Sequence, residues 1–175
     1  MMFWRVVALS LAAAMMSGCV TERGGLDYAA VSQKVGPPRA GQARIVVFRE
    51  KGYAGIADVG WEVMLDEGPL PELKTGTFVY LDRPAGHHQL TATMALFQGV
   101  TRHEFSAETG RTYFFLARPS QKAQTLGAMS AAGGIAGLVV GAAITSNNEN
   151  PGPLDFFPLD DAAARAAMSD LRVTP

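Results

Sequence analysis

Short segments rich in β-branched and aromatic residues recur along this chain, and each is followed by residues that favour turns. Ala43–Arg49 is apolar on both faces at its centre, whereas Trp61–Leu65 alternates apolar and polar residues. The segments of this kind are 43–49, 61–65, 77–81, 88–96, 101–107, 112–117 and 154–159. Several short strands separated by turns, with few helical patterns, predict a mainly β fold, a small antiparallel β-sandwich.

Turn residues sharpen this prediction. Residues 66–69 form a turn by residue type, and Gly86 and Gly110 can adopt backbone conformations forbidden to other residues. The tight spacing around Gly110 predicts that 101–107 and 112–117 pair as a hairpin. Because proline cannot donate to a ladder, Pro158 predicts that the last strand lies at a sheet edge.

A short helix is expected to close the chain. Asp160 is a suitable N-cap, and Asp161 suits the positive end of a helix dipole. Ala164, Met168 and Leu171 then share one face at helical spacing. We expect this face to join the core.

One long segment differs from the rest, because residues 123–148 carry no charge. Within it Gly133, Gly137 and Gly141 recur at every fourth position, the pattern of a glycine zipper. On a helix they would form a flat helix-packing face. The stretch 126–144 is near the lower length of a membrane span, which is about 17 residues, but alanine and glycine dominate it.

A single membrane crossing would separate the strand 154–159 from its sheet. A helical hairpin bent at Gly133 and Gly134 avoids this conflict, with arms of about 15 Å. Two interpretations stay open. The inserted hairpin dips into the near leaflet or self-associates, or it is a helix pair packed on the sandwich.

The start of the chain holds the sequence Met16-Ser17-Gly18-Cys19, in which Cys19 is the only cysteine. One positive charge and a short uncharged apolar run precede it, and that run is too short to span a bilayer. The stretch resembles the lipobox of bacterial lipoproteins. The resemblance implies that residues 1–18 are a signal peptide and that Cys19 is the lipid attachment site, receiving diacylglycerol and an acyl chain such as palmitate. The alternative is an ordinary signal peptide with a free thiol.

Val20 stands where many Gram-negative lipoproteins carry an aspartate that retains them in the inner membrane. The resemblance therefore implies a protein anchored to the outer membrane and facing the periplasm. Residues 19–42, rich in glycine and proline, are expected to form a lipidated tether, in which residues 28–31 are compatible with a short turn of helix. Residues 43–175 would then form one sandwich domain that contains the 123–148 insertion.

Removal of residues 1–18 leaves 157 residues with 14 basic and 16 acidic groups, a formal charge of −2. This length suits one domain with a core. No basic tract is present, so nucleic acid is not expected as a partner. The expected partners are the membrane, a second copy of the chain or another envelope protein. With its one cysteine lipidated the chain forms no disulfide.

About half of the chain resembles the bacterial lipoprotein family catalogued as domain of unknown function 2846. The matching stretches are Ala43–Arg49, Leu65-Asp66, Gly76–Tyr80, Pro84–Ala92 and Glu108–Phe114. The resemblance implies a small sandwich like the transthyretin or carboxypeptidase-regulatory type. It implies no activity and no catalytic residues.

Candidate chemistry is sparse. His87 and His88 would point to opposite faces of a strand and cannot readily share a metal. His103-Glu104 lacks a second histidine at helical spacing, and no cysteine is left for a structural metal. We therefore predict neither a catalytic nor a metal site and no cofactor other than the lipid. The acids Asp66, Asp82, Glu104 and Glu108 are interpreted as solubilising groups.

Three functions are compatible with the residues. The first is a non-enzymatic structural or binding module, for which Trp61, Phe78 and Phe97 offer an aromatic patch, although core packing is the simpler role for each. The second is a glycine-zipper protein that associates with membranes or with itself. The third is a periplasmic enzyme of unknown reaction, for which a loss of activity on replacing His88 would be the sign.

Overall fold

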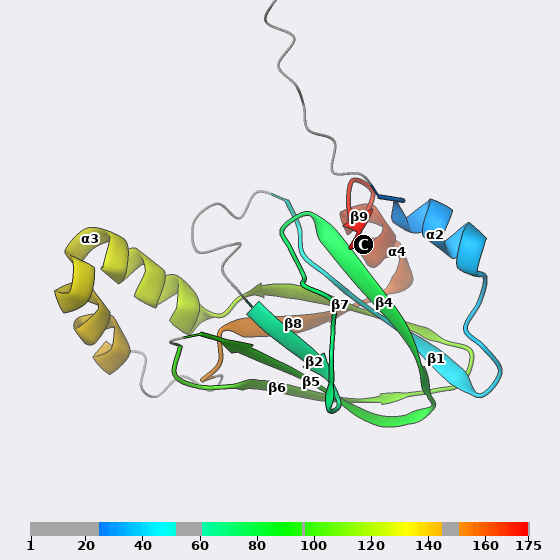
Figure 1. Cartoon of the computed structure of the whole chain (residues 1–175), viewed down its shortest axis with the longest axis horizontal. Helices are drawn as coiled ribbons and strands as arrows, with labels where there is room; N and C mark the ends of the chain where they lie inside the picture. The colour runs from blue at the N-terminus through cyan, green and yellow to red at the C-terminus, as the bar shows by residue number, and fades with distance from the viewer. Residues whose placement is uncertain (1–24, 52–60, 96, 145–150, 175) are drawn as a thin grey trace, which may run out of the picture.

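The computed structural model describes residues 25–51, 61–95, 97–144 and 151–174, and of 135–144 only the backbone. Two sheets face each other, and helices flank them (Figure 1). The strands are β1 (Gln42–Phe48), β2 (Trp61–Leu65), β3 (Gly68–Pro69), β4 (Thr77–Pro84), β5 (Gly86–Met94), β6 (Thr101–Ala107), β7 (Thr112–Pro119), β8 (Leu154–Leu159) and β9 (Arg172–Val173). The helices are α2 (Tyr28–Val35), α3 (Gln121–Ile144) and α4 (Asp161–Ala167). The mainly β sandwich that the sequence predicts is confirmed.

The larger sheet has the order β8-β7-β1-β4-β9, and the smaller has the order β3-β2-β5-β6. Most neighbours are antiparallel, as expected. Two pairs are parallel instead, β1 with β7 and β4 with β9. β1 therefore lies at the centre of the larger sheet, with Val46 opposite Tyr80 on one side and Phe114 on the other.

The central strand serves two cores, which explains why its sequence is apolar on both faces. Ile45 and Val47 face the smaller sheet, and Val46 and Phe48 face the helices α2 and α4. All four side chains are fully buried. The molecule thus has three layers, two sheets and a helix layer, and each face of the larger sheet is covered (Figure 1).

Several local predictions are confirmed. Trp61, Val63 and Leu65 are buried on one face of β2. At the end of the chain, Asp160 caps α4 by accepting a hydrogen bond of 2.8 Å from the Ala163 N–H. Ala164, Met168 and Leu171 are all buried against the larger sheet, but the helix ends at Ala167 and only Ala164 lies on it. β8, with its proline, lies at the edge of that sheet.

The predicted pairing of β6 with β7 is wrong. β6 pairs with β5 in the smaller sheet, whereas β7 joins β1 and β8 in the larger one. The turn at Gly110, which has a φ of 79°, carries the chain from one sheet to the other. The burial patterns explain the difference. β6 alternates and suits an edge with one wet face, while β7 is buried on both faces at its centre.

The expectation of a tether through residue 42 also needs correction. Residues 28–35 form α2, whose Tyr28 and Val31 are buried against the larger sheet. Asp27 caps the helix by accepting a hydrogen bond of 2.8 Å from the Ala30 N–H. These residues lack the apolar area to fold alone, but the sheet supplies the missing partner surface.

Candidate functional site

The α3 hairpin, residues 121–144, projects from one end of the sandwich (Figure 1). Its helix breaks at Gly134, where φ is 56° and ψ is −136°, at the bend that the sequence predicts. Residues 131–134 at the bend are exposed. In its described first arm, only the base at Ala123 is buried, with 5% exposure. That arm is therefore not packed on the sandwich, and the interpretation of a helix pair packed there is not supported.

The two ends of the hairpin are held together because β7 and β8 are paired neighbours. Pro119, just before α3, lies opposite Leu154, the first residue of β8. The chain therefore leaves and rejoins the larger sheet at one place. In the described residues, no helix is long and apolar enough to cross a membrane.

Buried hydrogen bonds hold the base of the hairpin. The buried Ser120 hydroxyl donates to the Gly152 carbonyl oxygen at 2.6 Å and accepts from the Ala123 N–H at 3.2 Å, which caps the helix. Gly152 packs so closely on Thr101 that an added Cβ atom would clash with the Thr101 nitrogen. These residues fix where the hairpin starts.

Lys122 is the last charged residue before the uncharged segment. Its Nζ atom donates to the carbonyl oxygens of Gln98, at 2.7 Å, and Pro151, at 3.1 Å. It also lies 5.2 Å from the ring centre of Phe97. The cap at Ser120 is not among the predicted features, although a serine followed by a helical stretch is a recognisable N-cap signal.

The three glycines of the predicted helix-packing face do not share one straight helix. Gly133 precedes the break at Gly134, and Gly137 and Gly141 follow it. A Cβ atom added at Gly133 would meet nothing within 4 Å. The continuous face that an unbroken helix would present is therefore interrupted.

The predicted lipobox, Met16 to Cys19, lies outside the described residues. The first described segment is attached to the end of the chain. The Val173 N–H donates to the Leu26 carbonyl oxygen at 2.9 Å, so the chain is already held by β9 just before α2.

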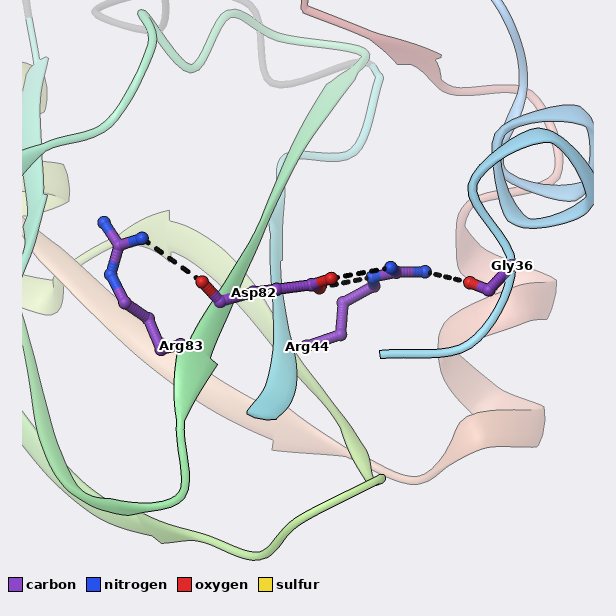
Figure 2. Close-up of polar contacts among 4 residues, drawn as sticks. All are labelled: Gly36, Arg44, Asp82 and Arg83. Carbon is purple, nitrogen blue, oxygen red and sulfur yellow. Dashed lines mark hydrogen bonds and ion pairs between the residues drawn. The ribbon is translucent and has the colours of Figure 1, made fainter. Parts of the chain in front are cut away.

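A buried ion pair holds the other end of α2 (Figure 2). Arg44 on β1 donates to both carboxylate oxygens of Asp82 on β4, at 2.7 and 3.0 Å. Its third donor reaches the carbonyl oxygen of Gly36, the C-cap of α2, at 2.6 Å. The hydrogen bonds that Arg44 donates to Asp82 raise the pKa of Arg44, against the opposing effect of burial. Asp82 is therefore structural, which corrects its interpretation as a solubilising acid.

Asp66 is also part of a structural contact. The His88 ring, 8% exposed, places Nδ1 2.9 Å from an Asp66 carboxylate oxygen and Nε2 2.8 Å from the Pro84 carbonyl oxygen. Burial pushes the pKa of Asp66 upward, but hydrogen bonds from His88 and the Gln89 N–H outweigh it and lower the pKa. The contact joins two turns at one corner of the sandwich.

The other histidines lie apart from this contact. His87 is exposed on the opposite face of β5, as predicted, and lies 3.5 Å from Glu104. His103 packs edge-on against Phe115, and burial lowers its pKa. Among the described residues, no group of three potential ligands is placed to hold a metal ion.

The suggested aromatic patch does not form. Trp61 is buried between the sheets, where the Arg49 guanidinium lies 3.8 Å from its ring centre. Phe78 is buried in the helix-side core, and Phe97 lies at the base of α3. The three rings therefore belong to three separate environments.

Comparison with known proteins gives no relative, because no family model matches the chain and no curated protein matches its sequence. The resemblance to a lipoprotein family stays a prediction from the motifs.

Proposed function

We propose that this protein is a lipid-anchored module of the Gram-negative cell envelope with a structural or binding role rather than a catalytic one. In this proposal the sandwich faces the periplasm from the outer membrane and presents the α3 hairpin as its contact element. The role of the hairpin as contact element rests on two features. Buried hydrogen bonds fix its base, and its bend is exposed and uncharged.

The anchor follows from the lipobox-like sequence and the family resemblance. The position of α2 adds a constraint, because only seven peptide units separate Cys19 from Leu26. Even fully extended they span about 25 Å. A lipidated Cys19 would thus hold the sandwich near the bilayer surface instead of lifting it away.

The anchor is tested by expressing the full chain and its Cys19→Ser variant in a Gram-negative host fed with a clickable palmitate analogue. The expected result is label on the wild-type chain in the outer-membrane fraction and none on the variant. A wild-type chain without label, recovered from the soluble periplasm, would overturn the proposal of lipid anchoring.

The role of the hairpin as contact element is tested by deleting Gly127–Ala143 from the lipidated protein. We expect the sandwich to keep its unfolding midpoint, because the deleted residues lie outside both described cores. Contacts of the hairpin trapped by crosslinking in intact cells, whether to lipid or to protein, should be lost. A deletion that leaves every crosslinked product in place would show that the contact surface lies elsewhere.

A further inference from the structure

The α3 hairpin is apolar on all sides, yet its bend is not buried in the protein. In 123–144 the polar side chains are Gln124, Thr125 and Ser130, which point in three directions around a helix, and the second arm has none. A helix on a protein surface keeps one polar face toward water, whereas a helix that is apolar all round is surrounded by apolar material. Residues 131–134 are nevertheless exposed.

We infer that the hairpin inserts, bend first, into the near leaflet of a lipid bilayer without crossing it. The two arms, 121–133 and 135–144, are about 20 and 15 Å long at 1.5 Å per residue. Half of a hydrocarbon core is about 15 Å. The bend therefore reaches toward the middle of the bilayer while both ends stay at one surface with β7 and β8.

The base of the hairpin carries its one charge. Lys122 is the only charged residue of α3, and it lies at the start of the helix beside the Phe97 ring. A lysine near the end of a membrane-inserted helix keeps its ammonium group among the headgroups. Insertion to this depth leaves the Lys122 ammonium group and the first turn of α3 among the headgroups and places the bend in the hydrocarbon.

Lipid fits the hairpin better than a second copy of the chain. Close association of two helices needs a continuous face of small residues. Here the break at Gly134 separates Gly133 from Gly137 and Gly141. Lipid needs no such register, since acyl chains adapt to any apolar surface.

This inference names the partner of the contact element in the proposed function, and its test removes the anchor so that the two can fail separately. The probe is the chain 19–175 carrying Cys19→Ser, floated with vesicles of phosphatidylethanolamine and phosphatidylglycerol. We expect it to float with the vesicles. An Ala132→Asp variant, with a charge at the exposed bend, should partition roughly ten-fold more weakly or worse. The matched Ser169→Asp variant, at an exposed site beside α4, should float like the parent.

Depth is measured with one fluorescent label, because Cys19→Ser removes the only native thiol. A label at Ala132→Cys should shift to the blue and be quenched by lipids brominated deep in their acyl chains. A label at Ser169→Cys should remain in water. Each of three results would overturn the inference: no flotation, flotation with the Ala132 label still in water, or a lipid-independent dimer abolished by Ala132→Asp.

Discussion

The two helices α2 and α3 differ in whether their apolar residues are buried against the sandwich. α2 has eight residues in a segment that looks like a loose tether, yet Tyr28 and Val31 are buried in the core. α3 has 24 residues without a charge after its first turn, yet its bend is exposed. Total apolar content therefore does not decide which helix packs on the sandwich.

The difference lies in side-chain size and in how each helix is held. Tyr28 fills a gap between Phe78 and Phe114, with edge-on ring distances of 5.7 and 5.6 Å. Contacts at both ends fix α2 to the sheet. The exposed residues directly before the bend of α3, 131–133, are alanine and glycine, which offer little area to a protein core. One large ring at the right place is thus worth more to the fold than many small apolar residues.

The largest expected effect is that of Tyr28→Ala, which tests whether α2 contributes more to stability than α3. Loss of the buried ring should lower the free energy of unfolding by about 3 kcal/mol, as for other aromatic truncations in cores. Leu126→Ala on α3, at a half-exposed site, should cost less than about 1 kcal/mol. Urea unfolding followed by tryptophan fluorescence measures both. Equal losses for the two variants would mean that α3 packs as tightly as α2.

The second effect concerns the ion pair at the end of α2. Arg44→Met leaves the Asp82 carboxylate, only 17% exposed, without its partner, and should cost about 2 kcal/mol. The double variant Arg44→Met with Asp82→Leu should recover most of this loss. Arg111→Met, which breaks an exposed pair with Glu108, is the matched control and should cost under about 0.5 kcal/mol. No recovery in the double variant would show that the Gly36 contact, and not the charge pair, holds α2.

Low pH should affect the stability of the sandwich but not the hairpin, because 123–144 has no titratable side chain and the sandwich does. The pKa of Asp66 is lowered by folding, so its contribution is present above the unfolded pKa and is lost as pH falls through the folded pKa. Asp66→Asn should therefore be less stable than wild type near neutral pH, by less than about 1 kcal/mol, because the carboxylate is 40% exposed and solvent screens its contacts. The two proteins should converge as pH falls below the ordinary aspartate range of about 4. Thermal unfolding between pH 3 and 7 measures this, and a constant gap over that range would contradict it.

The smallest expected effect is at the bend. Gly134→Ala places a side chain at a φ of 56° and should move or straighten the break, while Gly133→Ala, without positive φ, should only favour the first arm. Neither should change global stability by more than about 0.5 kcal/mol, because both sites are exposed. Hydrogen exchange of the amides around the bend should differ between them. A large loss of global stability in Gly134→Ala would show that the conformation of the bend affects the packing of the sandwich.

Sequence patterns were enough to predict the mainly β class, the cap at Asp160, the edge position of β8 and the bend at Gly134. Each depends on local rules of periodicity, hydrogen-bond donors or backbone freedom, so neighbouring residues suffice. The assignment of β6 and β7 to different sheets and the place of α2 in the core became visible in the folded molecule alone. Only the fold showed that Arg44, Asp82 and Gly36 meet. These outcomes depend on contacts between segments that are far apart in the sequence. A local residue pattern does not specify which apolar face a strand or helix will pack against.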